Sequence, residues 1–142
     1  MIDFRTLQKS SSPNTFLACT GSHCPAAKSD ISAPLVAAPV EAVMALWDAV
    51  IAAAPRVEET ARSGDGTQRE YIQRSKTFGF PDHIAVRFIA EDAAGKPATR
   101  VLMFSAAQKG YYDFGVNRRR VTTWLETLCR KAAAAAAEKT GP

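Results

Sequence analysis

The chain has 142 residues, of which 46% are hydrophobic and 23% are charged, as in an ordinary folded domain of one unit. No apolar run reaches the roughly 18 residues of a membrane-spanning helix, and the first residues lack a signal-peptide pattern, so we expect a cytoplasmic chain with no spanning segment. The net charge of +4 is carried by residues 100–131, where seven basic and two acidic residues leave +5; without interleaved aromatic residues or a reader motif, this mild excess does not indicate nucleic-acid binding.

Residues 1–38 are rich in Ser, Pro, Ala and Thr and predict an extended N-terminal arm, with a short strand at Ile31–Val36. Residues 39–142 form the rest of the chain, which we expect to be a single α+β domain. We therefore place the one organisational boundary of the sequence at residue 38.

Cys19 and Cys24 lie in the arm on either side of His23. A structural zinc site needs four ligands, and only Cys129 and His83 remain to complete one, so we expect no metal and no other cofactor. A disulfide between Cys19 and Cys24 suits an oxidising compartment better than the cytoplasm. Two reduced thiols in a packed loop are the favoured state for a cytoplasmic chain, and the three alternatives stay open.

A helix is predicted from Pro39, because apolar residues recur at three- and four-residue spacing up to Ala54, and Pro55 ends it. Trp47 lies on its apolar face and is expected in the core. Four strands follow, over residues 56–62, 67–76, 84–90 and 100–106. Short turns join them, including a Ser-Gly-Asp-Gly turn at 63–66 and a Gly- and Pro-containing turn at 91–98. The last strand is apolar on both faces and should be central or covered.

A long helix is predicted after Asn117, which is a suitable N-cap, because the residues that follow repeat apolar positions at helical spacing. Three arginines occupy its first turn, where the helix macrodipole disfavours each cation by about 0.3–1 kcal/mol. Either nearby acids pair with the arginines and close the loop onto the sheet, or the arginines and free N–H groups bind an external anion. The candidate residues for this anion site are Arg118, Arg119, Arg120, Asn117, Asp113 and Asp82.

The segment before this helix reads Gly110-Tyr111-Tyr112-Asp113-Phe114-Gly115-Val116-Asn117-Arg118-Arg119-Arg120-Val121. It resembles the hallmark of the domain of unknown function 1499 family, in which a Gly-(aromatic)-x-Asp-(apolar)-Gly-Val-Asn-basic-x-Arg pattern leads into a C-terminal helix. Gly79-Phe80-Pro81-Asp82 and the pair Cys19 and Cys24 resemble two weaker family elements, so the resemblance covers roughly residues 16–129. It implies bacterial or plastid relatives and a fold, but no agreed activity. This chain departs from the family at 104–108, where Phe-Ser-Ala-Ala-Gln replaces a polar Arg-Ser-x-Ser-Arg strand.

These elements predict an α+β, two-layer domain: an antiparallel sheet of four or more strands covered by two helices, the long one C-terminal. The order is similar to a reduced helix-grip fold, in which a curved sheet wraps a C-terminal helix and binds apolar ligands, although a fold does not fix a function. A cavity between sheet and helix would be lined by the pocket candidates Phe80, Phe88, Met103, Phe104 and Trp124.

We therefore expect a non-catalytic binding module for a small amphiphilic or anionic ligand, whose head group the triple arginine would hold. The alternative is an accessory protein that docks on a protein partner through its arm or its basic face. An enzyme is less favoured, because Asp82, His83 and Asp113 are ordered by no recognisable motif and no phosphate cradle or nucleophile elbow is present.

Overall fold

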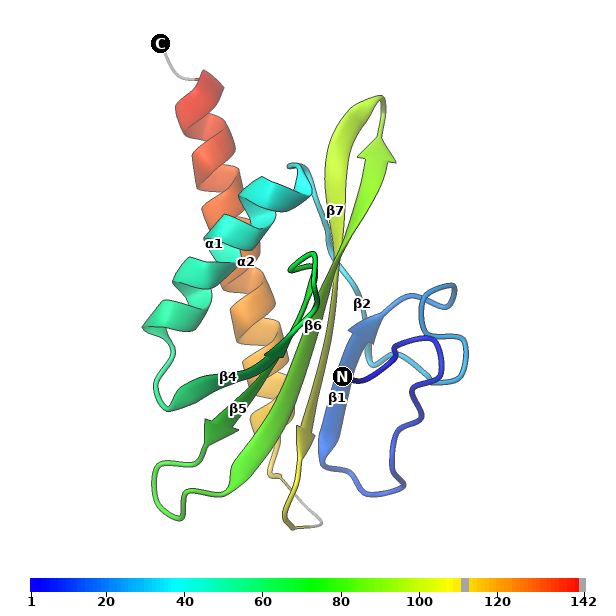
Figure 1. Ribbon diagram of the computed structural model, residues 1–142, viewed down its shortest axis with the longest axis vertical. Coiled ribbons are helices and arrows are strands. Elements are labelled where there is room, and N and C mark those ends of the chain that lie inside the picture. The colour runs from blue at the N-terminus through cyan, green and yellow to red at the C-terminus, as the bar shows by residue number, and fades with distance from the viewer. Residues whose placement is uncertain (111–112, 141–142) are drawn as a thin grey trace.

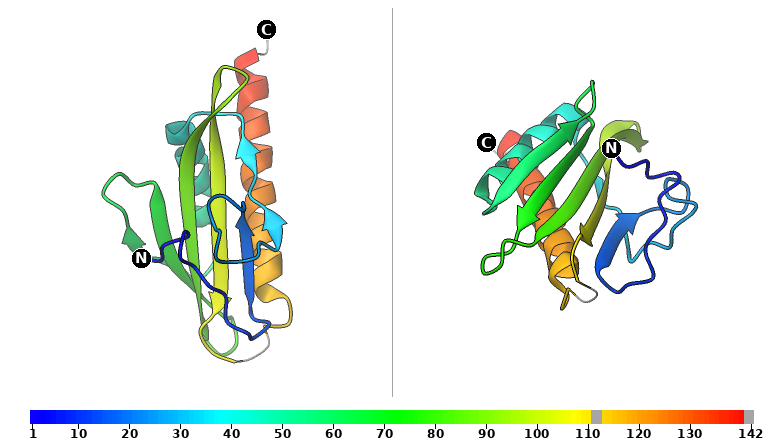
Figure 2. Two further views of the ribbon diagram at one scale, coloured as in Figure 1. Left: turned by 90° about the vertical axis from the view of Figure 1, so that its right-hand side faces the viewer. Right: turned by 60° about the horizontal axis from the view of Figure 1, so that its bottom comes forward.

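The structure is a computed structural model that describes residues 1–110 and 113–140. Helices α1 (Val40–Ala53) and α2 (Val116–Thr140) lie on one face of a β-sheet, and the N-terminal segment lies on the other face (Figures 1 and 2). The predicted α+β fold, with two helices and the long one C-terminal, is confirmed. The strands are β1 (Thr15–Cys19), β2 (Ile31–Ser32), β3 (Leu35–Val36), β4 (Val57–Arg62), β5 (Gln68–Arg74), β6 (Pro81–Ala93) and β7 (Lys96–Ala107).

The seven strands form one sheet in the order β2-β1-β7-β6-β5-β4, and β3 pairs with β7 alongside β1. The β4–β5–β6–β7 meander is antiparallel, as expected. The sheet as a whole is mixed, because β2 runs parallel to β1. β7 lies inside the sheet between β1 and β6, which agrees with its apolar sequence on both faces.

The first 38 residues are extended, but they are also part of the sheet. β1 pairs with β7, with Thr15 opposite Ala106. The carboxylate of Asp30 accepts a hydrogen bond from the Leu17 backbone N–H at 2.8 Å, which holds the chain beside β1 as it returns to β2. Phe4 is buried in the layer that this segment forms over the sheet. The segment therefore supplies the second covering layer of the sheet.

Trp47 is the centre of the core between the sheet and the two helices. Its ring lies 6.0 Å from the rings of both Phe88 on β6 and Trp124 on α2, in edge-to-face contacts that such pairs prefer. Its indole N–H donates to the Tyr71 hydroxyl on β5 at 3.0 Å. One side chain of α1 thus joins two strands and the C-terminal helix, and the predicted core role of Trp47 is confirmed.

The opposite face of the sheet has its own apolar cluster, to which Leu102 and Phe104 contribute from β7. Val101 and Met103 belong to the core on the helix side. This division follows from the strand itself, since successive side chains point to opposite faces. Both faces of β7 are therefore covered by apolar side chains.

The β6–β7 hairpin is longer than predicted and projects beyond the rest of the sheet (Figure 1). Ala93 still pairs with Lys96, so the turn contains only Ala94 and Gly95, with φ of 52° and 80°. Positive φ at both central residues is the geometry of two-residue hairpin turns that match the strand twist. The expected turn at residues 91–98 is thus mostly strand.

Candidate functional site

The start of α2 is capped by Asp113. Its carboxylate accepts hydrogen bonds from the backbone N–H groups of Gly115 and Asn117 at 2.9 and 3.2 Å. It also accepts from the side-chain amide of Asn117 at 2.8 Å. Burial alone would raise the pKa of Asp113, but these hydrogen bonds outweigh it and hold the pKa below the ordinary 3.8. A negative charge at the N-terminal end of a helix also interacts favourably with the helix macrodipole.

The prediction that Asn117 caps α2 is wrong. The helix already begins at Val116, so Asn117 lies within its first turn and is fully buried. Its amide donates to the Asn14 carbonyl at 3.0 Å, next to β1, and its side-chain oxygen accepts from Ser105 on β7 at 2.5 Å. Asn117 therefore fastens the helix to β7 and to the residue before β1, and the capping role belongs to an acid four residues earlier.

Arg120 is almost completely buried and all of its donor nitrogens are used. Its Nη2 donates to Asp82 on β6 at 2.9 Å, and its Nε donates to Gln73 on β5 at 2.5 Å. Nη1 donates to Ser105 at 3.1 Å and to Asn117 at 2.8 Å. No buried side-chain nitrogen or oxygen in the described residues lacks a hydrogen-bond partner. This network leaves no room on Arg120 for an external anion.

The ion pair between Arg120 and Asp82 is a partly desolvated one. Burial raises the pKa of Asp82 above 3.8 even though Arg120 opposes the shift, and burial lowers the pKa of Arg120 although Asp82 opposes it. Loss of hydration thus exceeds the mutual attraction for both partners. The pKa of Asp82 is higher in the folded chain than in the unfolded chain. The contribution of Asp82 to the free energy of unfolding therefore weakens as the pH rises from about 3.8.

Arg118 and Arg119 point away from this network and are exposed. The guanidinium of Arg118 lies 5.9 Å from the centre of the Phe16 ring, and Arg119 donates to the Phe114 carbonyl at 3.1 Å. Among the described residues neither has a carboxylate partner. The three arginines therefore divide: Arg120 follows the ion-pair interpretation, through Asp82 rather than Asp113, and the other two stay open to an external anion.

Two loops meet at this end of the molecule. The β5–β6 loop and the β7–α2 connection lie together at the lower end of the view (Figure 1), and the Gln108 N–H donates to the Pro81 carbonyl between them at 3.2 Å. The Lys109 ammonium lies 5.8 Å from the centre of the Phe80 ring, which stacks on Phe78 with centroids 5.4 Å apart. Tyr111 and Tyr112 of the hallmark stretch lie outside the described residues.

Three aromatic side chains at this end face solvent. Phe114 is 87% exposed, Phe78 is 74% exposed and Phe80 is 47% exposed. The same loops and the first turn of α2 also carry exposed basic residues. We call this surface the aromatic-basic end; its members are Phe78, Phe80, Phe114, Lys76, Lys109, Arg118 and Arg119.

The sequence identified three members of the aromatic-basic end, Phe80, Arg118 and Arg119, and missed the other aromatic residues. The sequence Asp113-Phe114-Gly115 could have indicated that the Phe114 ring is exposed. A turn that precedes a capped helix leaves the side chain at its centre outside the core.

The remaining pocket candidates lie in the core. Phe88, Met103 and Trp124 are buried on the helix side and pack into one cluster around Trp47. Phe104 is buried on the opposite face of the sheet. These side chains hold the two layers together, and an amphiphile would have to bind outside the sheet–helix interface.

Two of the acid–base candidates, Asp82 and His83, are held apart by the strand geometry. Asp82 faces α2 and pairs with Arg120, whereas its neighbour His83 faces the other side, where its Nε2 lies 2.9 Å from a carboxylate oxygen of Glu70. Asp113 caps the helix. His83 therefore lies outside the Arg120 network, whereas Asp82 and Asp113 are joined within it through Arg120 and Asn117.

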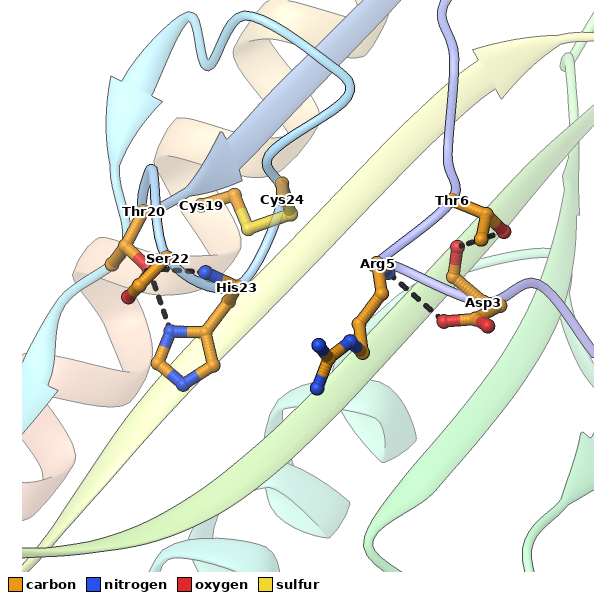
Figure 3. Close-up of a disulfide and its surroundings, with 8 residues drawn as sticks. All are labelled: Asp3, Arg5, Thr6, Cys19, Thr20, Ser22, His23 and Cys24. Carbon is orange, nitrogen blue, oxygen red and sulfur yellow. Dashed lines mark hydrogen bonds between the residues drawn. A yellow bond between two sulfur atoms is a disulfide. The ribbon is translucent and has the colours of Figure 1, made fainter.

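Cys19 and Cys24 form a disulfide, with their Cα atoms 6.2 Å apart (Figure 3). The favoured state of two reduced thiols is wrong. The loop returns through a Cys24 N–H to Thr20 carbonyl hydrogen bond of 2.9 Å, which brings the two side chains together on the sheet surface. Cys129 lies on α2, on the opposite side of the sheet, and is free. In the described part of the chain, no three His, Cys, Asp or Glu side chains gather as a metal site would require.

The fold and this polar network define a small α+β domain whose C-terminal helix is fastened to its sheet by buried polar side chains. The chain belongs to the DUF1499 family, whose description is protein of unknown function: the family model matches residues 7–128. A search of curated proteins finds no match. Neither described helix has the length and apolar character needed to cross a membrane.

Proposed function

We propose that this chain is a non-catalytic binding module that docks through its aromatic-basic end on a membrane surface rich in anionic lipid headgroups. The observation that carries the proposal is the exposure of Phe114 and Phe78 at an end whose basic side chains have no carboxylate partner among the described residues. Rings with neighbouring basic side chains suit the boundary between acyl chains and headgroups. Trp47 and its neighbours fill the sheet–helix interface, so the lipid would contact the outer surface of the domain.

The backbone at Phe114 supports a functional role for its ring. Phe114 adopts φ 55° and is followed by Gly115 at φ 79°. A bulky residue in the left-handed region is disfavoured by about 1–2 kcal/mol. The ring buries too little surface in the folded chain to offset this strain. Strain without a packing benefit is typical of functional positions.

The aromatic-basic end carries an excess of positive charge, which attracts an anionic membrane surface. The only acid in the β5–β6 loop and the segment 107–119 is Asp113, and its carboxylate is occupied by the helix cap. Arg74 adds a further cation at the end of β5. Each basic residue near an anionic leaflet contributes about 1 kcal/mol of attraction, which salt screens.

The size of the surface favours a membrane over a protein partner. At about 150–250 Å² per ring, the exposed parts of the three phenylalanines add up to roughly 400 Å². A stable protein interface buries about 800 Å² on each partner. A bilayer needs no matching flat surface, because separate ring tips insert independently. Inserting Phe114 or Phe78 fully would contribute about 1.5–3 kcal/mol each.

The disulfide points to a compartment other than the one expected from the sequence. Disulfides persist in oxidising environments and are rare in the cytoplasm. We therefore propose that the membrane surface that the chain meets lies in an oxidising compartment. Thiol counting on protein from its natural source tests this: one reactive thiol, at Cys129, supports it, and three reactive thiols contradict it.

The test is co-sedimentation with phosphatidylcholine vesicles, with and without about one-third phosphatidylglycerol to supply the anionic surface. The chain should bind the anionic vesicles and lose binding as salt is raised. A triple variant, Lys76→Gln with Lys109→Gln and Arg119→Gln, should bind about 100-fold more weakly, at about 1 kcal/mol per charge.

The matched control removes three charges away from this end: Lys28→Gln with Lys96→Gln and Lys139→Gln. Its affinity for the anionic vesicles should stay within a factor of about three of the unmodified chain. The β6–β7 hairpin, which carries Lys96, and the C-terminal end of α2, which carries Lys139, lie at the opposite end of the molecule (Figure 1), and Lys28 belongs to the N-terminal segment. Salt screens charges at such a separation from the docked surface. Equal losses in the two triple variants would show a net-charge effect and refute a defined docking end. No binding to either vesicle would refute membrane docking and favour the protein partner.

A further inference from the structure

A second candidate site lies on the face of the sheet opposite the helices, and it shares no residue with the aromatic-basic end. It is a pocket of about 260 Å³ between the N-terminal segment, the disulfide loop and strands β6 and β7. In Figure 3, Arg5 extends from the N-terminal segment and His23 from the disulfide loop, and both residues line this pocket. The lining residues are Asp3, Phe4, Arg5, Ser22, His23, Arg87, Ile89 and Leu102.

Two features bring the lining residues together: the alternation of side chains along β6 and β7, and the disulfide that closes the loop of His23. Arg87 and Leu102 are directly opposite each other on β6 and β7 and share the face away from the helices. The disulfide closes the loop that carries His23, and the Thr20 hydroxyl lies 2.6 Å from Nδ1 of the ring and accepts the His23 N–H at 3.1 Å. The loop is thus held in place before any ligand arrives.

Donors in the pocket remain available. The Arg5 guanidinium has no hydrogen bond or carboxylate partner among the described residues. Arg87 uses one N–H, from Nη1 to the Gln68 side-chain oxygen at 3.2 Å. Asp3 is the one acid of the lining, and its Oδ1 accepts the Arg5 backbone N–H at 2.9 Å. The two guanidiniums and the one carboxylate of the lining together carry a formal charge of +1, which a monoanion would neutralise.

The floor of the pocket is apolar. Phe4 and Leu102 are buried there, and Ile89 continues the surface along β6. Since one water molecule takes up about 30 Å³ of the liquid, the volume corresponds to roughly nine waters. That is the size of an organic anion of about eight non-hydrogen atoms, below the range of about 300–1,000 Å³ typical of drug-sized ligands.

We infer that this pocket binds a small monocarboxylate, with its carboxylate between the guanidiniums of Arg5 and Arg87 and its hydrocarbon part on Phe4 and Leu102. Guanidinium forks match a carboxylate in shape and charge. A phosphate dianion is disfavoured because Asp3 faces the same space and because the floor has no polar partners for further oxygens.

The experiment is an NMR titration of the ¹⁵N-labelled chain with hexanoate, which has the size and charge argued above. Amide signals of the pocket residues should shift and saturate. Hexanol, which lacks the charge, should bind at least about tenfold more weakly, since it loses the hydrogen bonds to charged groups. Acetate should bind at least about tenfold more weakly because it leaves the apolar floor uncovered. Inorganic phosphate should do so because it meets the carboxylate of Asp3 and has no hydrocarbon part for the floor.

The variants Arg5→Gln and Arg87→Gln should each weaken hexanoate binding by about 10- to 100-fold. Both side chains are exposed, so the fold should be kept. The matched control is Arg130→Gln on the outer side of α2, which should bind as the unmodified chain does. Binding of hexanoate that is unchanged in the pocket variants, or phosphate binding as tight as hexanoate binding, overturns the inference. Vesicle docking does not involve these residues, so its outcome is separate.

Discussion

Replacing Phe114 with asparagine should stabilise the folded chain and at the same time weaken its binding to anionic vesicles. The two effects have separate causes. Phe114 is held at φ 55°, a conformation that asparagine adopts far more readily than a bulky aromatic residue. Its ring is also the most exposed of the three at the aromatic-basic end. The substitution therefore relieves backbone strain and removes the ring that would enter the bilayer.

The magnitudes follow from the φ value and the exposure of Phe114. The left-handed conformation is disfavoured by about 1–2 kcal/mol for an ordinary L residue. Because the side chain is 87% exposed, it retains only about 0.2–0.4 kcal/mol of the 1.5–3 kcal/mol that full burial would contribute. The net gain in the free energy of unfolding should be about 1 kcal/mol, or a rise in Tm of about 3 °C for a domain of this size. Vesicle affinity should fall by about 10- to 100-fold.

Urea denaturation followed by circular dichroism measures the first effect, and co-sedimentation measures the second. Phe78→Asn is the matched control, because Phe78 is also exposed but is absent from the residues with positive φ. It should reduce vesicle binding with little change in stability. A fall of about 1 kcal/mol or more in the free energy of unfolding of Phe114→Asn would contradict backbone strain at this position. An unchanged vesicle affinity would contradict insertion of the Phe114 ring.

Three further predictions concern stability. Arg120→Met should lower the free energy of unfolding by about 3–5 kcal/mol, because it leaves Asp82 partly buried without its partner, whereas Arg118→Met should change it by no more than about 0.5 kcal/mol; equal effects in urea titrations would contradict the burial argument. The pKa of Asp113 is lowered, so its stabilisation is complete above about pH 3.8 and is lost as the pH falls through the lower folded pKa; Asp113→Asn should flatten the fall in stability below pH 3.8, and an unchanged slope would disprove this. Cys24→Ser should cost about 2 kcal/mol, since the disulfide closes a loop with a sequence separation of 5, and dithiothreitol should destabilise the unmodified chain equally but leave the variant unaffected.

The sequence predicted the elements that depend on local patterns. Apolar spacing placed α1 and α2 to within a few residues, and the strands β4 to β7 were all foreseen. In β6, the alternating residues Ile84, Val86 and Phe88 belong to the core on the helix side. These elements have one buried face each, so their periodicity carries the information.

The sequence could not predict the features that depend on long-range pairing. β1 lies in a Ser- and Pro-rich segment, and its partner β7 is about 90 residues away in the chain. The sequence does not distinguish Arg118, Arg119 and Arg120 from one another. Only the docking angle of α2 decides that Arg120 points at Asp82 and that the other two point outward. The same docking made Asn117 a buried link rather than a cap.

Docking through the aromatic-basic end is tested most directly by the fluorescence of a Phe78→Trp variant. The native Trp47 and Trp124 are buried, so a change on mixing with vesicles would come from the new indole. Its emission should shift to the blue with anionic vesicles and be quenched by lipids brominated on their acyl chains. An emission that stays at the wavelength of a water-exposed indole, while the chain sediments with those vesicles, would show that this end does not enter the bilayer.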